Sequence, residues 1–376
     1  MACSLSATHL LVWVVLCAAG VRGQRQVRYR SWKFVGDSPL PISGVQSPSL
    51  QLDTLDGGRP YLAFAAPSGG DTYLALVQRL SSRGNWTFVV TRPPTGLGQL
   101  ASDVGQTQLA LHPTIKGRPY AAFADIRGGG QCSVMVYLNS TWRYLGKRAF
   151  SAGVATGLTF AMDPKAKPVD SGRAGQATAM HYSNAQWRHL GVRGLTPGAA
   201  DNLALAISPA GVVHLAFQDL SAAEPKGRVV KFAGGAWQPA LGISMAIHPT
   251  RGLYVAFRGD AAGAARLAYD NVTVTSYSTA WRAVGPSGFG GRNSLYTSIG
   301  LGPDGMPYVA MQCGQQGKAC VYKKEKGSAT WSAVGPRAGF SLSTVTNLNL
   351  RFYRGTPFIS YVESVAGGVV VVKTYA

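Results

Sequence analysis

Short segments in which apolar and polar residues alternate recur along the whole chain, and each ends in a glycine or another turn residue. Alternation with a period of two residues is the pattern of a half-buried β-strand. The clearest recurring phrase has the form Trp-x-x-Val-Gly, in which Leu can replace Val. Five copies have this form, at residues 32–36, 142–146, 187–191, 281–285 and 331–335. The pattern therefore predicts an all-β protein built from repeats.

Two further phrases complete each repeat. The second follows the tryptophan phrase by a loop and one strand, and it reads PYLAF at residues 60–64, PYAAF at 119–123 and PYVAM at 307–311. The third is rich in β-branched residues, as in SVMVY at 133–137 and GVVVV at 368–372. Asp-Gly turns between these phrases are hairpin signals. Each repeat thus predicts four short antiparallel strands, with the tryptophan strand last.

The spacing of the repeats predicts the architecture. Tryptophans occur at positions 32, 86, 142, 187, 237, 281 and 331, about 44 to 56 residues apart, which is the length of a four-stranded propeller blade. Seven sets of the first three strands follow the strand at 26–35, and the last set ends at Ala376 with no tryptophan strand after it. We expect residues 24–376 to form a single domain, a seven-bladed β-propeller of four-stranded antiparallel blades, whose N-terminal strand completes the last blade and closes the ring.

Two repeats depart from this pattern. In the third, residues 163–173 replace the Pro-Tyr phrase, which predicts a short or irregular second strand. In the fifth, Trp237 is followed almost directly by the next apolar segment, 242–247. Such asymmetry can create a single ligand site, and sequence drift without function produces the same pattern.

The tryptophan and Pro-Tyr phrases resemble those of uncharacterised secreted β-propellers built from repeats of this kind, and more loosely those of propeller lectins. The resemblance covers residues 26–376. It implies a propeller fold and no particular activity, because propellers serve as binding proteins, hydrolases, lyases and oxidoreductases.

The N-terminus predicts export. An apolar core at residues 10–19 is too short to span a bilayer, and small residues precede a cleavage position before Gln24, so residues 1–23 are interpreted as a signal peptide. Asn85, Asn139 and Asn271 lie in N-glycosylation sequons. No later apolar run has the length of a membrane span. We expect a secreted glycoprotein of the extracellular space, the cell wall or the matrix.

The charge indicates the class of partner. The formal net charge is +20, and it is one unit lower once Arg22 leaves with the signal peptide. A surplus of this size attracts polyanions. Outside the cell these are acidic or sulfated polysaccharides and anionic glycoproteins. Nucleic acid is disfavoured because no basic run is interleaved with aromatic stacking positions. The oligomeric state is left open.

The cysteines indicate a disulfide rather than a metal site. Cys313 and Cys320 flank a short turn between two predicted strands, a spacing that allows a disulfide across the hairpin. Cys132 is then left over, either as a buried thiol or as a partner for another chain. Without clustered histidines or a second cysteine pair, no metal is expected. No phosphate-binding or nucleophile motif is present, and no cofactor is expected.

Two enzymatic classes, glycosidases and polysaccharide lyases, are candidates for a secreted propeller. A glycosidase needs two suitably placed carboxyl groups, and the mature chain has three glutamates and no sialidase aspartate box. A polysaccharide lyase needs a cation to neutralise a uronate and a His or Tyr to move the proton. His181, Tyr182 and Arg173 in the third repeat are the candidates for a lyase, and they also suit a structural role in a sheet. His112 and His248 share one repeat position and are interpreted as structural.

Binding is the more economical hypothesis. In the predicted strand order, the loops after the tryptophan strand and those between the second and third strands share one face. The ligand-binding candidates there are Arg193, Asn202, Arg228, Arg292, Asn293, Lys318 and Arg337. Their guanidinium, ammonium and amide groups suit sulfate, carboxylate and hydroxyl groups, although such residues are often only solvated. The sequence favours a non-catalytic protein that binds an anionic extracellular glycan or glycoprotein, with a polysaccharide lyase as the alternative and a structural matrix subunit as the third hypothesis.

Overall fold

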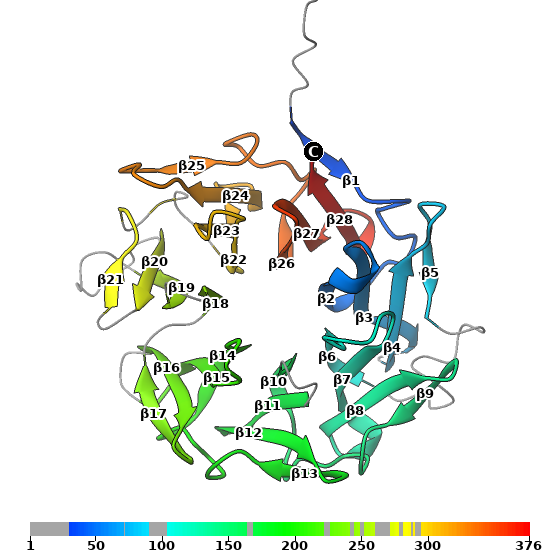
Figure 1. The fold of residues 1–376 in the computed structure, drawn as a ribbon. Helices are drawn as coiled ribbons and strands as arrows, with labels where there is room; N and C mark the ends of the chain where they lie inside the picture. The colour runs from blue at the N-terminus through cyan, green and yellow to red at the C-terminus, as the bar shows by residue number, and fades with distance from the viewer. Residues whose placement is uncertain are drawn as a thin grey trace, which may run out of the picture. The chain divides into compact units, whose positions relative to one another are not determined.

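The computed structural model describes residues 30–70, 72–89, 104–163, 168–221, 226–240, 244–248, 252–259, 271–277, 281–286, 289 and 295–376. The chain divides into two units, Met1–Arg30 and Ser31–Ala376. The predicted signal peptide lies outside the described residues, and the second unit is an all-β propeller. Its described strands pair into seven four-stranded antiparallel sheets arranged around a common axis (Figure 1).

In six of the sheets the strands follow one another from the axis outward in chain order, and in the sheet that contains β26, β27 and β28 the outer strand is the N-terminal β1. The innermost strands are β2 (Gln46–Asp53), β6 (Val104–Leu111), β10 (Thr156–Met162), β14 (Ala200–Ile207), β18 (Ser244–His248), β22 (Ser298–Leu301) and β26 (Val345–Tyr353). The second strands are β3 (Arg59–Gly69), β7 (Pro119–Asp125), β11 (Pro168–Ala174), β15 (Val213–Asp219), β19 (Gly252–Gly259), β23 (Pro307–Cys313) and β27 (Thr356–Glu363). Except for β11, they contain the Pro-Tyr phrase or a variant of it.

The outer half of each sheet holds the other two predicted strands. The third strands are β4 (Thr72–Leu80), β8 (Gln131–Leu138), β12 (Gln176–Ser183), β16 (Lys226–Ala233), β20 (Asn271–Tyr277), β24 (Lys318–Lys324) and β28 (Val369–Tyr375). The outer strands are β5 (Trp86–Phe88), β9 (Thr141–Tyr144), β13 (Gln186–His189), β17 (Ala236–Ala240), β21 (Trp281–Ala283), β25 (Trp331–Ala333) and β1 (Trp32–Phe34). Single 3-10 turns lie at η1 (Thr54–Asp56), η2 (Ile126–Gly128) and η3 (Val365–Gly367).

The tryptophan phrase joins neighbouring sheets at the periphery. The indole Nε1 of each of five tryptophans donates to the carbonyl of the Val or Leu in the preceding phrase, at 2.6 to 3.1 Å. The pairs are Trp32 with Val334, Trp86 with Val35, Trp187 with Leu145, Trp237 with Leu190 and Trp331 with Val284. The phrases that begin at Trp32, Trp187 and Trp331 thus each supply the donor for one junction and the acceptor for the next, which explains why Trp and Val or Leu recur together.

Stacked rings and a glycine complete these junctions. Phe150 lies parallel to Trp187 with ring centroids 4.2 Å apart, and Phe340 lies in the same way on Trp32 at 4.4 Å. The glycine that ends the phrase has a left-handed backbone, as at Gly335 with φ 97°. A Cβ on Gly335 would lie 2.9 Å from the Trp32 ring, so the position requires glycine for both conformation and space.

Hydroxyl and amide side chains join the sheets again near the axis. Ser49 Oγ of β2 accepts from Leu109 N of β6 at 3.1 Å, and Ser298 Oγ of β22 accepts from Leu350 N of β26 at 3.0 Å. Asn349 Nδ2 of β26 donates to the carbonyl of Pro48 in β2 at 2.8 Å. These bonds satisfy backbone groups on the innermost strands, which have a neighbour within the sheet on one side only.

The N-terminal strand completes the sheet of the C-terminal repeat. Strand β1 pairs antiparallel with β28, and Trp32 is opposite Tyr375. Backbone bonds in both directions between Ser31 and Ala376 extend the pairing. Figure 1 shows β1 at the outer edge of the sheet that contains β26 to β28. The N-terminal strand therefore covers an edge that β28 would otherwise expose.

Of the two divergent repeats, the third is more regular than the sequence predicts, and the fifth agrees with the prediction. Strand β11 has seven residues and pairs along its length with both β10 and β12, so the prediction of a short second strand was wrong. Main-chain hydrogen bonds from two neighbours do not depend on the Pro-Tyr phrase, which explains the difference. In the fifth repeat, β17 ends at Ala240 and β18 begins at Ser244, which is the short connection expected.

Candidate functional site

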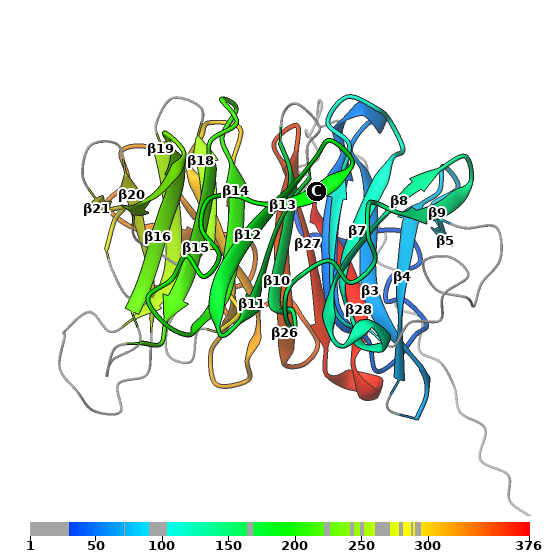
Figure 2. The same ribbon diagram turned by 90° about the horizontal axis from the view of Figure 1, so that it is seen from below.

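Strand order divides the connections between two faces. Because the strands are antiparallel, the connections after the second strand and after the outer strand end on the same side, which we call the loop face. The connections after the first and third strands lie on the opposite side, the turn face. Figure 2 shows the strands running between these two faces. The loop face is the one on which the sequence predicts the ligand-binding residues.

At one repeat position on the loop face, different sheets carry different side chains that anchor the end of the second strand through hydrogen bonds, an ion pair or a disulfide. It is the last residue of strand β7, β15, β23 or β27, and it is occupied by Asp125, Asp219, Cys313 and Glu363. All four side chains are buried, at 0 to 3% exposure. Their partners lie on the third strand of the same sheet, in adjoining loops, or both.

Asp125 is the most strongly engaged of the four. Arg148 donates to both of its carboxylate oxygens, through Nε at 2.6 Å and Nη2 at 2.9 Å. Gly128 N and Ser133 Oγ donate to it as well. Burial by itself raises the pKa of Asp125, but the bonds and the charge of Arg148 outweigh burial and hold that pKa below its usual value. The aspartate is therefore ionised and structural at neutral pH.

Asp219 has the same structural role in the sheet of the fourth repeat. Its Oδ2 lies 2.5 Å from Nε of Arg228, and its Oδ1 accepts from the backbone and hydroxyl of Ser221. The bonds from Ser221, followed by Arg228, lower the pKa of Asp219. Arg228 is one of the predicted ligand-binding residues, and the structure places it in this ion pair, where its charge is already neutralised.

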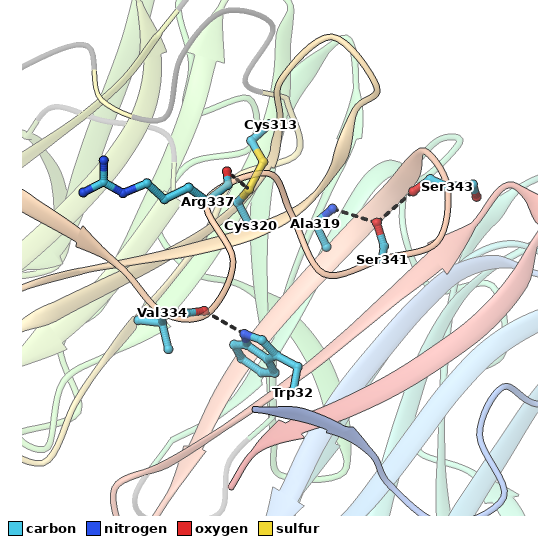
Figure 3. The surroundings of a disulfide bond; sticks show 8 residues. All are labelled: Trp32, Cys313, Ala319, Cys320, Val334, Arg337, Ser341 and Ser343. Carbon is cyan, nitrogen blue, oxygen red and sulfur yellow. Dashed lines mark hydrogen bonds between the residues drawn. A yellow bond between two sulfur atoms is a disulfide. The ribbon is translucent and has the colours of Figure 1, made fainter. Parts of the chain in front are cut away.

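The same pair of positions in the β23–β24 hairpin carries a disulfide. Cys313 and Cys320 are bonded with their Cα atoms 5.9 Å apart, which confirms the predicted pairing (Figure 3). Cys320 Sγ lies 3.6 Å from the carbonyl of Arg337, and Ser341 Oγ accepts from Ala319 N beside it. Cys132 is buried in β8, away from this disulfide.

The exposed charges of the described loop-face connections are mainly positive. Arg127, Lys147, Arg193 and Arg337 are exposed there, together with one exposed acid, Asp37. The turn face also exposes four described cations, Arg83, Lys116, Lys326 and Arg354, but it carries more acids: Asp56 pairs with Arg59 and Lys116, Glu325 pairs with Lys323, and Asp304 is exposed. Exposed cations are therefore present on both faces, and on the loop face they have fewer acidic neighbours.

Exposed apolar side chains gather on the same face. Ten large apolar residues are exposed within the described part of the chain, and seven belong to loop-face connections: Ile126, Val154, Val192, Leu220, Tyr296, Leu342 and Val365. An accumulation of exposed apolar groups on one side of a protein marks an interaction surface. Exposed apolar area thus points to the loop face, where exposed cations are also present.

Closest to the axis, the loop face ends in an inner rim of left-handed residues. They occupy one repeat position, at or just before the start of an innermost strand: Ser47, Gly157, Asn202, Tyr296 and Asn347, with φ between 47° and 69°. In four of these sheets the residue lies in a β-bulge of the innermost strand. A bulge turns its side chain out of the regular alternation. Asn202, Tyr296 and Asn347 are exposed.

Besides Arg228, which pairs with Asp219, the predicted binding residues separate into three groups. Arg193 and Arg337 are exposed on the loop face, and Asn202 is on the inner rim, where its Nδ2 donates to Gln218 Oε1 at 2.9 Å. Lys318 begins β24 beside the disulfide and is half-buried. Arg292 and Asn293 lie outside the described residues.

The lyase candidates do not form one cluster along the backbone. His181 and Tyr182 are half-buried neighbours in β12, where His181 pairs with Arg188 and Val169. Arg173 pairs with Ala177 in the same hairpin, four positions from the His181 pair, or about 13 Å along the strands. Tyr182 packs on Trp187 with ring centroids 5.5 Å apart. His112, interpreted as structural, accepts from Thr114 N and Ile115 N through Nδ1.

Sequence reasoning missed Arg148 and Tyr296. Arg148 lies in the loop after a tryptophan phrase, and its partner Asp125 is 23 residues away in the sequence, so no local signal predicts the pair. The repeat itself could have revealed Tyr296, because aligning the residue two positions before Ser298 with Ser47, Gly157, Asn202 and Asn347 shows an aromatic side chain where the others are small or are asparagine.

The described residues hold no group of three or more His, Cys, Asp or Glu side chains placed to bind a metal ion. Among the helices of the described part, none is long and apolar enough to cross a membrane.

Comparison with known proteins shows the fold alone. No family model and no curated protein matches the chain. Among solved structures, polysaccharide lyase Uly1 is similar over 90% of this chain and 91% of its own, with a TM-score of 0.55 at 11% identity. A Trypanosoma rangeli sialidase matches 89% of this chain with a TM-score of 0.51 at 9% identity, and this chain spans 55% of it. A Mycobacterium tuberculosis puromycin-hydrolyzing peptidase matches 86% of this chain with a TM-score of 0.52 at 15% identity, and this chain spans 53% of it. The chain therefore shares a propeller fold with proteins that are named as a lyase, a sialidase and a peptidase.

Proposed function

We propose that this protein is a secreted binding or matrix protein whose loop face holds an acidic or sulfated polysaccharide, or an anionic glycoprotein. The observation that carries the proposal is the coincidence, on one face, of exposed cations and most of the exposed large apolar side chains of the described residues. Guanidinium groups bind sulfate and carboxylate in a bidentate manner, and apolar groups beside them suit the less polar faces of sugar rings.

A ring closed by strand pairing and by side-chain hydrogen bonds would support this role. We propose that the seven sheets are the seven blades of one propeller, with β1 as the strand that closes it. The pairing of β1 with β28 and the bond from Trp32 to Val334 support this closure. A closed ring is a rigid platform for loops that bind a ligand.

Secretion is supported by the positions of two sequons. Asn85 and Asn139 are both exposed, and they lie in the turns between β4 and β5 and between β8 and β9. Asn271 is the first residue of β20. Glycans on Asn85 and Asn139 would project from the turn face and leave the loop face open.

A polysaccharide lyase is the alternative, favoured by the adjacent His181 and Tyr182 and by the fold shared with a polysaccharide lyase. The distance along the hairpin between His181 and Arg173 weighs against this alternative. A structural matrix subunit without a discrete ligand is the third hypothesis.

One experiment separates these functions. The mature protein is passed over immobilised heparin, chondroitin sulfate and polygalacturonate, and the NaCl concentration that releases it is recorded, while soluble polymer is assayed for new unsaturated chain ends. Binding without such ends supports the proposal. Unsaturated ends that disappear in His181→Ala support the lyase. No retention at low salt contradicts both and leaves the structural subunit.

Matched variants test the face itself. Arg193→Gln with Arg337→Gln removes two exposed cations from the loop face, and Arg83→Gln with Lys326→Gln removes two from the turn face. Both pairs lower the net charge equally. We expect the first pair to release at clearly lower salt and the second to behave almost like wild type, because screened surface charges act over about 8 Å at physiological ionic strength. Equal shifts would mean that net charge, rather than a site, retains the protein.

A further inference from the structure

Tyr296 is the unusual member of the inner rim. Its backbone is left-handed, with φ 51°, and its side chain is 47% exposed. The other rim positions carry glycine, serine or asparagine, of which glycine and asparagine tolerate this conformation best. A bulky residue with positive φ is an outlier whose strain persists only where the surroundings impose it, and such outliers cluster at ligand sites.

No packing role within the described residues accounts for this side chain. The other aromatic residue of the same loop, Phe289, stacks on Trp331 with ring centroids 4.1 Å apart and belongs to the core. Tyr296 has no ring contact and no hydrogen bond to its hydroxyl within the described part of the chain, and nearly half of its surface faces solvent. Neither stability nor solubility explains an exposed aromatic ring at a strained position.

The neighbouring rim residue, on the adjacent sheet, carries polar groups. Strands β22 and β26 are joined just inside the rim by the bond between Ser298 Oγ and Leu350 N, so Tyr296 and Asn347 enter the loop face from adjacent sheets. Asn349 Nδ2 donates to the carbonyls of Asn347 and Pro48, which holds the Asn347 bulge against the next sheet. Asn347 is exposed, and its amide bonds only weakly, to Thr346 Oγ1 at 3.4 Å.

We propose that Tyr296 and Asn347 form a subsite for one sugar ring of the polymer that the loop face binds. The aromatic ring stacks on the apolar face of a pyranose, and the Asn347 amide, both a donor and an acceptor, bonds its hydroxyl groups. The inference rests on the proposed function and deepens it: the exposed arginines attract the chain through its charge, and the rim recognises it as a sugar. This subsite acts without charge.

The lack of charge makes the subsite separable from the arginines. We expect Tyr296→Asn, which suits a left-handed backbone, to fold at least as stably as wild type and to weaken oligosaccharide binding about fivefold to tenfold. Its salt dependence should match wild type, whereas Arg193→Gln with Arg337→Gln should reduce that dependence. Tyr296→Phe keeps the stacking ring and should retain binding. Leu342→Asn removes a more exposed apolar side chain from the same face and is the control for loss of apolar surface.

Calorimetric titrations with oligogalacturonate, chondroitin sulfate oligosaccharides and neutral cello- and xylo-oligosaccharides test the subsite. Tyr296→Asn that binds every one of them as tightly as wild type overturns the inference, as does a wild-type protein that binds none of them. Tyr296-dependent binding of the neutral sugars alone would support the subsite and contradict the anionic ligand of the proposed function. Binding of the charged sugars that is equally strong in Tyr296→Asn would keep the proposed function and remove the subsite.

Discussion

At the scale of single residues, chemically different pairs do the same work at the end of the second strand. The Asp125 network, the Asp219–Arg228 ion pair and the Cys313–Cys320 disulfide all anchor the end of the second strand at the loop face. A repeat protein keeps the geometry of a position and allows its chemistry to drift. Buried acids of this kind are therefore poor evidence for catalysis in this chain.

The pH dependence of stability follows from Asp125. Because its folded pKa lies below its usual value, its contribution to stability is complete above the unfolded pKa of about 4 and is lost as the pH falls through the folded value. We expect Asp125→Asn to cost about 3 kcal/mol at neutral pH, since it leaves Arg148 without its partner. In thermal melts between pH 2 and 7, the melting temperature of Asp125→Asn should fall less steeply with decreasing pH than that of wild type. An unchanged steepness would contradict this role.

At the scale of elements, indole hydrogen bonds from the outer strands join neighbouring sheets at five described junctions. A phenylalanine stacks on the tryptophan at three of them, and the junction between Trp32 and Val334 links residues 302 positions apart. Strand β1 is therefore both a member of a sheet and part of one of these junctions. Its Phe34 also covers the ammonium group of Lys373, which lies 4.6 Å from the ring centroid.

Removal of this strand should open the molecule. We expect deletion of residues 24–36 to lower the free energy of unfolding by about 3 kcal/mol or more, because it exposes the edge of β28 and removes the Trp32 ring from Phe340. Chemical denaturation monitored by circular dichroism measures this loss. Deletion of residues 24–29, which leaves β1 intact, is the control. Equal stability of the two deletion variants would contradict a closing role for β1.

At the scale of the whole second unit, the two faces have different surfaces. Exposed apolar groups accumulate on the loop face beside exposed cations, while the turn face carries ion pairs, exposed charges of both signs and two exposed sequons. A surface arranged in this way can carry glycans on one side and a ligand on the other.

This division predicts independence of the two faces. We expect Asn85→Gln with Asn139→Gln, expressed in a secreting eukaryotic host, to reduce the mass of the protein and to leave retention on polyanions unchanged. Mass spectrometry and the salt elution measure the two effects. Altered retention would place a glycan near the ligand and contradict the assignment of faces.

Local patterns predicted most of the strands and the order within each repeat, because alternation, β-branched residues and Asp-Gly turns act over a few neighbouring residues. The spacing of Cys313 and Cys320 predicted their bond for the same reason. Local patterns misjudged β11, whose hydrogen bonds come from its neighbours rather than from its own side chains. They also could not reveal the ion pair of Arg228, one of the predicted ligand-binding residues, since its partner Asp219 becomes close only when the hairpin forms.

The sequence by itself thus determined the repeat, the four-stranded unit, the disulfide and the surplus of positive charge, all of which depend on composition or on short spacings. Only the tertiary structure decided which charges remain exposed, which face collects the apolar side chains, and that Tyr296 is exposed with a left-handed backbone at the rim. Those properties arise from packing between sheets, which brings together residues that no local pattern relates.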